Sequence, residues 1–287
     1  MTIYTFVDVF KQRYKNKLSN NYLKHYTSLK NHLQEFEKES GFKVSFETIN
    51  KEFYLLFTDY LSSKGKKINT IGANIRRLKR LMNEAVEDNL TGNLGHRSRN
   101  FKVLNEEVDM IYLSEKELDE YYKMELDNDR YRYIRDLFVL HCHTGLRHSD
   151  WSKLSLENIR DGNLFLRTQK TKEYVIIPMH PIVLDVLKKY EGKTVIPTNQ
   201  EVNRVLKYIG EYARVNKISE GTNVKWTQIT THTARRSFAT NAYLAGIPML
   251  AIMKITGHKK TETFLRYIRV TKLENAMKLK DHPFFNR

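Results

Sequence analysis

The first part of the chain carries apolar residues at the spacing of amphipathic helices. Over residues 70–87, five apolar side chains recur three or four positions apart and form one stripe: Ile71, Ile75, Leu78, Met82 and Ala85. Residues 20–37 are also amphipathic, and the apolar pattern of residues 50–61 is ended by Gly65. Because a helix brings such positions onto one face, the pattern predicts a helical bundle over residues 1–95.

The face of helix 70–87 opposite that stripe is polar and basic. At about 100° per residue, Arg76, Arg80 and Asn83 lie away from the apolar side chains. A basic face on a packed helix suits contacts with phosphates, which fix position and carry little sequence information. An ordinary solvated helix face would give the same pattern, so both interpretations stay open.

Residues 96–110 have the composition of a linker. Turn-forming residues precede them, and the segment contains Arg97 and Arg99. We therefore expect a flexible, basic connection between the helical domain and a second domain over residues 111–287. Such a connection suits two domains that clamp a duplex, so both arginines join the predicted DNA-contacting residues.

The second domain mixes helices with a short sheet. A capping box at Ser114 and Glu117 begins its first helix. Two β-rich segments, 163–168 and 174–179, flank a turn and predict a hairpin. Helical segments follow at 231–246, 248–257 and 261–267. The expected fold is mostly α with a small β-sheet, in which a helical bundle precedes an α+β domain.

The composition indicates a globular chain that faces a polyanion. The 287 residues are 40% hydrophobic, enough for two domain cores, and the formal net charge is +16. This charge suits double-stranded DNA, although lysine kept for solubility gives the same balance. The sequence has no apolar run of about 18 residues and no signal-like N-terminus, so we expect no membrane partner.

The single cysteine, Cys142, excludes an internal disulfide. It stands between His141 and His143 in an apolar, helix-like stretch. On a helix, residues two apart point about 200° from each other, so the two histidines could not share a metal ion. Buried packing is the expected role of all three residues, and no metal site is predicted.

Six residues of the second domain stand in order within chemically informative frames: Arg147, Lys170, His232, Arg235, His258 and Tyr267. The frames read Thr-Gly-Leu-Arg-His-Ser-Asp, Gln-Lys-Thr, His-Thr-Ala-Arg-Arg-Ser-Phe-Ala-Thr and Thr-Gly-His, with the tyrosine nine residues after the last histidine. About 0.7 His-x-x-Arg matches are expected by chance in this composition, and one occurs at His96 without the rest of the frame. The specific signal is therefore the ordered set.

This ordered set resembles the tyrosine recombinases, a family that includes phage and conjugative-transposon integrases and Xer-type resolvases. The resemblance is dense from about residue 110 to the C-terminus. It implies a site-specific recombinase with a core-binding domain over residues 1–95 and a catalytic domain over residues 111–287, serving integration or excision of a mobile element. It also implies a tetramer on double-stranded DNA, with accessory DNA-bending proteins as further partners. The location that it implies is cytoplasmic and nucleoid-associated, in a bacterium.

By this resemblance, Arg147 and Arg235 grip the scissile phosphate and His258 donates to a non-bridging oxygen. Arginine suits the grip because its guanidinium is always charged and offers a planar fork of donors. Tyr267 attacks the phosphorus and forms a 3′-phosphotyrosyl link. His232, one helical turn from Arg235, is our first choice for the group that takes the tyrosine proton.

Lys170, at the hairpin tip, is expected to protonate the departing 5′ oxygen, with Lys172 and Arg167 as rival candidates. Asp150 is expected to support the site by orienting Arg147, and a surface ion pair between the two is the alternative. The resemblance implies neither metal nor cofactor, since the phosphotyrosyl link stores the bond energy. The sequence also has no Gly-x-x-x-x-Gly-Lys-Ser/Thr loop.

Several alternatives stay open at this point. Residues 272–287 could dock on a neighbouring protomer or fold back onto their own domain. The chain has no evident arm-binding domain, so it is either a two-domain, Xer-like enzyme or a fragment. A type IB topoisomerase-like enzyme would use the same cleavage chemistry without strand exchange, and a DNA-binding protein without catalysis would explain the charge alone.

Overall fold

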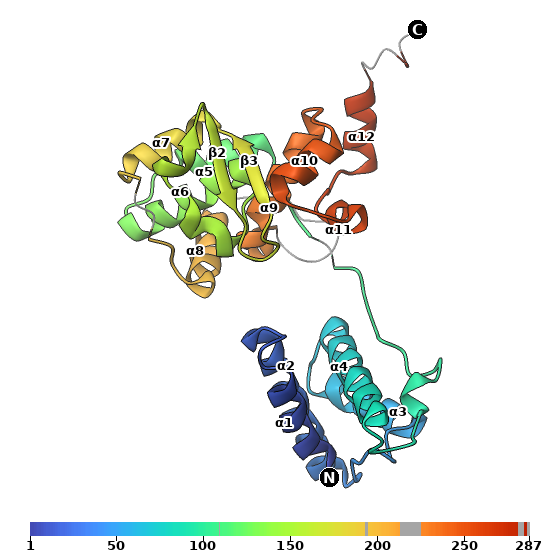
Figure 1. The fold of residues 1–287 in the computed structure, drawn as a ribbon. Coiled ribbons are helices and arrows are strands. Elements are labelled where there is room, and N and C mark those ends of the chain that lie inside the picture. The colour runs from blue at the N-terminus through green and yellow to red at the C-terminus, as the bar shows by residue number, and fades with distance from the viewer. Residues whose placement is uncertain (109, 193–194, 213–224, 281–283, 286–287) are drawn as a thin grey trace. The chain divides into compact units, whose positions relative to one another are not determined.

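The computed structural model describes residues 1–108, 110–192, 195–212, 225–280 and 284–285 (Figure 1). The chain divides into two compact units, Met1–Val108 and Asp109–Arg287. Each unit has a hydrophobic core of its own. Among the described residues, no helix combines the length and the apolar content needed to cross a membrane.

The first unit is a bundle of helices, as the apolar pattern predicted. Its elements are α1 (Ile3–Arg13), α2 (Asn20–Ser40), α3 (Lys51–Ser63), α4 (Ile68–Glu87) and the 3₁₀ turn η1 (Gly95–Arg97). Ser19 and Asn50 cap α2 and α3 by accepting hydrogen bonds from backbone N–H groups of the first turn. The apolar stripe of α4 is buried, which confirms the predicted orientation of that helix. Helix α1 was not predicted from the sequence.

The segment after α4 packs on the first unit, whereas the sequence predicted a flexible linker here. His96 and Phe101 are fully buried against the helical unit. Lys79 Nζ donates to the carbonyl of Phe101 at 3.0 Å, and the hydroxyl of Tyr54 donates to the carbonyl of Lys102 at 3.1 Å. This part of the predicted linker therefore belongs to the first unit.

The same packing continues to residue 106. Asn69 accepts from the backbone N–H of Glu106 and donates to its carbonyl. A Cβ at Gly72 would lie 1.8 Å from the carbonyl oxygen of Leu104, so α4 has a glycine where this segment crosses it. The prediction of a flexible connection was wrong for residues 96–106, because their apolar side chains complete the first core.

The second unit is mostly helical, with one small sheet, as predicted. Its helices are α5 (Glu115–Lys123), α6 (Asp129–Thr144), α7 (Pro181–Lys189), α8 (Asn199–Tyr212), α9 (Thr231–Leu244), α10 (Met249–Thr256), α11 (Thr261–Leu265) and α12 (Lys272–Leu279). Three further 3₁₀ turns are η2 (His148–Lys153), η3 (Leu156–Asn158) and η4 (Lys225–Gln228). The capping box of Ser114 and Glu117 begins α5, which confirms that prediction.

The sheet has the antiparallel order β1-β2-β3. Its strands are β1 (Ile159–Arg160), β2 (Asn163–Arg167) and β3 (Tyr174–Pro178). β2 and β3 form the predicted hairpin, in register from Asn163↔Pro178 to Arg167↔Tyr174. Alternate residues point into the core, so the turn that carries Lys170 projects from the end of a well-anchored ribbon. β1 was not predicted.

Helix α6 forms the centre of the second unit and packs against α5, α7, α8 and α9. His141 is buried and stacks on Trp151, with ring centroids 4.1 Å apart. His143 stacks on His180 at the same separation, and Cys142 is buried. Packing is therefore the role of these residues, as expected. In the described part of the chain, no group of three or more His, Cys, Asp or Glu side chains is arranged to hold a metal ion.

Candidate active site

Arg235 lies at the centre of the candidate site, on the first turns of α9. A capping box between Thr230 and Thr233 fixes the start of this helix. Arg235 is only 2% exposed. Its Nη1 donates to the carbonyl of Gly145 at 2.7 Å, and its Nη2 donates to the carbonyl of Thr256 at 2.5 Å. Arg235 thus ties together the C-terminal ends of α6 and α10.

The turn at Gly145 brings Arg147 to the same place. Gly145 has a φ of +63°, and a Cβ there would lie 2.5 Å from Cδ1 of Phe238, so only glycine fits. Arg147 follows the turn and is partly buried. Within the described residues, Arg147 Nη1 and Arg235 Nε are buried and have no hydrogen-bond partner. Buried donors of this kind are costly unless an acceptor arrives, which favours an anion between the two guanidiniums.

The electrostatics of the two arginines agree with an anion site. Burial and the positive charge of Arg147 lower the pKa of Arg235 to about 9, although Tyr267 and Asp150 act in the opposite direction. Arg235 remains charged at neutral pH but is stabilised mainly by carbonyl oxygens. A bound phosphate would supply the missing negative charge.

His258 and Tyr267 complete the cluster on the other side of Arg235. Gly257 ends α10 in the left-handed conformation and turns the chain into His258. The rings of His258 and Tyr267 lie 4.7 Å apart, and Cζ of Arg235 lies 5.4 Å from the centre of the Tyr267 ring. Burial, Arg235 and Arg147 lower the pKa of His258 to about 3, so its ring is neutral at physiological pH.

His232 lies on the first turn of α9 and is exposed to solvent. Desolvation lowers its pKa, and the charges of Arg236, Arg235, Arg147 and Lys170 lower it further. A neutral imidazole is therefore favoured, and a neutral imidazole can accept a proton. All six predicted residues are thus linked by direct contact or by their charges, with Lys170 acting on His232 from the hairpin.

The candidates for the leaving-group acid lie in different settings. Lys170 is exposed in the β2–β3 turn. Lys172 has a positive φ of 57° at the other side of that turn. The guanidinium of Arg167 is already engaged, because its Nε donates to the carbonyl of Lys172 at 2.9 Å and it stacks on Tyr174. Of the three, Lys170 is the one whose charge reaches His232.

Asp150 contacts the hairpin. Its Oδ1 accepts from the backbone N–H of Gln169 at 2.6 Å, next to Lys170 in the chain. Where the structure describes the chain, neither a hydrogen bond nor an ion pair joins Asp150 to Arg147, so neither the expected orienting contact nor the alternative surface pair is present. Asp150 is fully buried, and its Oδ2 has no partner in the described residues. Its observed contact positions the turn that presents Lys170.

Two of the predicted DNA contacts on α4 are engaged within the first unit. The guanidinium of Arg80 lies between 5.1 and 5.8 Å from the ring centres of Phe10, Tyr14 and Tyr22. Asn83 Oδ1 lies 2.8 Å from His96 Nε2 and accepts from Arg97 Nε at 3.0 Å. Neither interpretation of Arg80 from the sequence, a phosphate contact or an ordinary solvated face, predicted this packing against aromatic rings. The exposed members of the predicted set are Arg76, Arg97 and Arg99.

Two further residues of α9 have roles that the sequence did not reveal. Arg236 is buried, and its Nε donates to the carbonyl of Ile111 at 2.8 Å while its Nη2 donates to Thr233 Oγ1 at 3.0 Å. It therefore fastens the first turn of α9 to the start of the second unit. Thr240 hydrogen-bonds to the segment that carries Tyr267. Both residues stand inside the histidine–arginine frame, which was the available signal.

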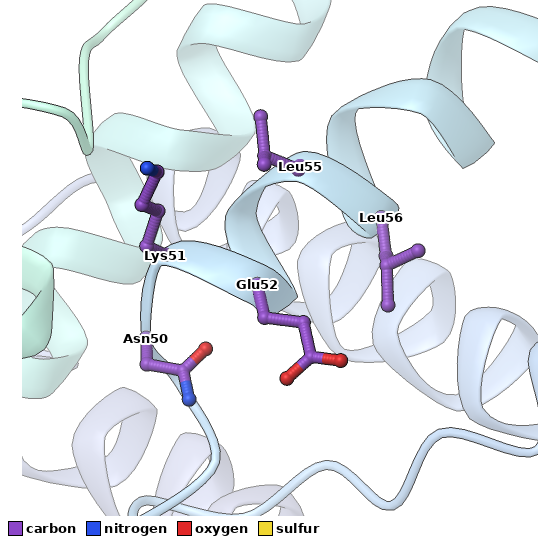
Figure 2. A pocket seen from close by; sticks show the side chains of 5 residues that line it. All are labelled: Asn50, Lys51, Glu52, Leu55 and Leu56. Atoms are coloured by element: carbon purple, nitrogen blue, oxygen red, sulfur yellow. The ribbon is translucent and has the colours of Figure 1, made fainter.

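Surface hollows do not by themselves locate this site. One hollow of about 540 Å³ lies over the start of α3 and is lined by Asn50, Lys51, Glu52, Leu55 and Leu56 (Figure 2). Figure 2 shows these side chains spread along one helix, with no convergent set of ionisable groups. Another hollow, of about 450 Å³, lies beside His258 and is also lined by Tyr174 and Ile176 of β3. Only the second hollow adjoins the site of Arg235, through His258.

Comparison with known proteins identifies the family. The profile of the phage integrase family matches residues 112–274, and that of the phage integrase SAM-like domain matches residues 2–97. The chain belongs to the phage integrase family. This integrase-family chain is a tyrosine recombinase, as its motifs predicted. A search of curated proteins found no match to it.

Solved integrases have the same fold. A Tn1549 transposon integrase (residues 82–397 of that protein) in complex with circular-intermediate DNA is 17% identical with a TM-score of 0.70, and the match covers 98% of this chain and 100% of that one. A lambda integrase dimer bound to a COC′ core site is 17% identical with a TM-score of 0.73, covering 94% and 96%. A lambda integrase tetramer on a Holliday junction is 18% identical with a TM-score of 0.72, covering 94% and 78%.

Proposed function

We propose that this protein is a site-specific DNA recombinase that cleaves and rejoins DNA through a 3′-phosphotyrosyl intermediate. The observation that supports this most strongly is the pair of buried N–H groups of Arg147 and Arg235 that have no partner in the described residues, with the ring of Tyr267 5.4 Å from Arg235 Cζ. These donors would suit a backbone phosphate, and the phenol would be the nucleophile. Because the chain belongs to the phage integrase family, we interpret this arrangement as a site for DNA cleavage and rejoining.

The arginines would grip the non-bridging oxygens of one phosphate. Fixed cationic donors stabilise the extra negative charge of a pentavalent transition state, commonly the largest catalytic contribution. His258 lies within 3.2 Å of Arg235 Nη2 through its Nε2, so it can contact the same phosphate group. The neutral ring of His258 would donate a hydrogen bond from its protonated nitrogen.

Tyr267 would attack the phosphorus in line with the departing 5′ oxygen. A phenol has a pKa of about 10 and attacks slowly unless nearby cations favour the phenolate. Arg235 supplies such a charge at 5.4 Å from the ring centre. His232, neutral and partly exposed, would take the phenolic proton.

Lys170 would protonate the leaving 5′ oxygen. The hairpin places it at an exposed tip, and the contact of Asp150 with Gln169 holds that tip against η2. When a 5′ hydroxyl of another strand attacks the phosphotyrosyl link, the same groups act in reverse. A P–O bond to the incoming 5′ oxygen forms as the bond to the Tyr267 oxygen breaks, so the number of P–O bonds does not change. The cycle uses no external energy source.

Double-stranded DNA and further copies of the chain are the proposed partners. The lambda integrase match is a tetramer on a Holliday junction, and we propose the same assembly here. Leu273 and Met277 of α12 are exposed, whereas the hydroxyl of Tyr112 hydrogen-bonds Glu274 and holds the helix to its own domain. The exposed apolar side chains suit docking on a neighbouring protomer. Residues 281–283 and 286–287 of this predicted segment lie outside the described residues.

The proposed role is integration or excision of a mobile element in the bacterial nucleoid. The likeness to the Tn1549 transposon integrase supports a mobile element over a chromosomal locus. Accessory DNA-bending proteins remain part of the proposal.

The function can be tested with a library of nicked half-sites made from genomic DNA. The protein is incubated with the library, digested with protease, and the DNA ends that retain a tyrosine remnant are sequenced. We expect linked ends that share one sequence motif. Linked ends without any shared motif, together with relaxation of supercoiled plasmid, would indicate a topoisomerase-like enzyme. The absence of linked ends would contradict the proposal.

A further inference from the structure

Thr240 is a buried threonine of α9 that contacts the segment after α11. It is fully buried, five residues after Arg235 in the same helix. Its Oγ1 donates to the carbonyl of Tyr267 at 3.1 Å and accepts from the backbone N–H of Arg269 at 3.2 Å. One hydroxyl therefore contacts the backbone at two points on the C-terminal side of the Tyr267 Cα, namely the carbonyl of Tyr267 and the N–H of Arg269.

This use of a helical threonine hydroxyl is unusual. A buried serine or threonine inside a helix commonly donates to the carbonyl of its own helix three or four residues earlier. Ser237 and Thr256 do so in this domain, toward Thr233 and Ile252. Thr240 instead uses its donor and an acceptor on residues 27 and 29 positions away in the chain. Its contacts thus serve the Tyr267 segment and not the helix itself.

The two hydrogen bonds of Thr240 add a contact with α9 to a backbone that also forms turn hydrogen bonds of its own, including one from the N–H of Ile268 to the carbonyl of Leu265 at 3.3 Å. Tyr267 follows the end of α11, where its N–H donates to the carbonyl of Phe264 at 2.7 Å. Thr240 fixes the carbonyl side of the same residue. The direction of the Tyr267 side chain is thereby set by both ends of its peptide.

The same helix carries the arginine that faces the tyrosine. Arg235 Cζ lies 5.4 Å from the centre of the Tyr267 ring. Because Arg235 and Thr240 belong to one rigid helix, the two hydrogen bonds of Thr240 set the position of the phenol relative to the guanidinium. A shift of about 1 Å in such a site can slow a reaction by about 100-fold.

We propose that Thr240 is a positioning residue for the nucleophile, holding Tyr267 at attacking distance from the phosphate gripped by Arg235. The inference rests on the function proposed above. It adds to that function a hydroxyl that would touch neither DNA nor the reacting atoms.

The test compares two substitutions that differ in the hydroxyl. Thr240→Val keeps the branched shape and removes the hydroxyl, whereas Thr240→Ser keeps the hydroxyl and removes a methyl group. The rate of covalent complex formation is measured at saturating protein on nicked half-site DNA recovered from the library selection. We expect Thr240→Val to be slower by about 10- to 100-fold and Thr240→Ser to be close to wild type. DNA binding should change by less than about twofold in both, since the hydroxyl is buried.

A matched control comes from the first unit. Thr58 has 9% exposure, and its hydroxyl donates to the carbonyl of Tyr54 within α3 at 2.9 Å. Thr58→Val therefore removes a nearly buried hydroxyl far along the chain from Tyr267, and it should cleave at the wild-type rate. Melting temperatures are recorded for every variant. If Thr240→Val does not fold, Thr240→Cys, with a weak thiol donor, should cleave at a rate between those of wild type and a variant without the donor.

A second readout does not depend on cleavage. With 3-fluorotyrosine at position 267, the ¹⁹F resonance should shift or broaden in Thr240→Val and stay near its wild-type position in Thr240→Ser. A wild-type rate and an unchanged resonance in Thr240→Val would overturn the inference, as would equal slowing in the Val and Ser variants. If the wild-type protein forms no covalent complex, the proposed function fails, and the ¹⁹F comparison still decides whether Thr240 positions Tyr267.

Discussion

At the scale of single residues, the site is organised around a buried cation that forms no ion pair with a carboxylate among the described residues. Arg235 is held by the carbonyls of Gly145 and Thr256, and Arg147 brings a second positive charge toward it. Such an arrangement disfavours the unliganded state, because buried charges are usually paired. The site is therefore arranged in advance to bind one anion. Burial and the same cations lower the pKa of both His232 and His258.

Arg236 offers a test of that electrostatic coupling. It is the charge with the largest effect on His232, and its removal in Arg236→Gln should raise the pKa of His232. If neutral His232 is the proton acceptor, cleavage is lost as the pH falls through this pKa, so the acid limb of the pH–rate profile should move to higher pH. NMR titration of His232 and single-turnover cleavage both report the shift.

Arg236→Lys is the matched control, because it keeps the charge. It should leave the acid limb close to its wild-type position even if stability decreases through the lost contact with Ile111. An acid limb that moves equally in the Lys and Gln variants would contradict electrostatic tuning of His232 by Arg236.

Some residue-scale properties could be predicted from the sequence and others could not. The order and frames of Arg147, His232, Arg235, His258 and Tyr267 are local patterns, so their membership in one set could be predicted. Which nitrogen atoms stay unpaired depends on carbonyls 90 and 21 residues away from Arg235, and no local pattern encodes those contacts. The aromatic cage of Arg80 likewise comes from residues of other helices.

At the scale of elements, two helices that end at glycines position residues of the site. α6 ends at Gly145 before Arg147, and α10 ends at Gly257 before His258. These stops were predictable, because apolar periodicity followed by glycine is a local signal. β1 has only two residues, too few for a pattern. The packing of residues 96–106 on the first unit escaped prediction because their turn-rich, basic composition masked a few core side chains.

The turn at Gly145 gives an element-scale prediction. Gly145→Ala forces a left-handed alanine and a Cβ 2.5 Å from Phe238, next to the carbonyl that holds Arg235. We expect a loss of about 2–4 kcal/mol in the free energy of unfolding, measured by chemical denaturation, together with slower cleavage. Gly41→Ala is the control, since Gly41 has a φ of +70° and no atom within 4 Å of its Cβ position. It should lose only the backbone contribution of about 1–2 kcal/mol.

At the scale of the whole molecule, two units with separate cores share a net charge of +16. Charge of this size supports binding to a polyanion whose affinity falls steeply with salt. The structure separates arginines available to phosphate from those engaged within a core. In α4, Arg76 is exposed, whereas Arg80 is surrounded by three aromatic rings.

This contrast predicts different outcomes for two adjacent turns of one helix. Arg76→Gln should weaken DNA binding and reduce the slope of log affinity against log salt by about one, without lowering the melting temperature. Arg80→Gln should lower the melting temperature of the first unit, because it removes cation–π contacts that contribute about 0.5–2 kcal/mol. Salt titrations of DNA binding and thermal melts distinguish the two. A reduced salt slope in Arg80→Gln with unchanged melting would show that Arg80 contacts phosphate after all.

The most direct measurement is mass spectrometry of the protein–DNA adduct. The protein is trapped on nicked half-site DNA, digested with protease and nuclease, and the peptide that carries the nucleotide is sequenced. We predict a single modified residue, Tyr267, with a phosphodiester to a 3′ end, and no adduct in Tyr267→Phe although that variant still binds DNA. An adduct on another residue, or one that persists in Tyr267→Phe, would contradict the proposed mechanism.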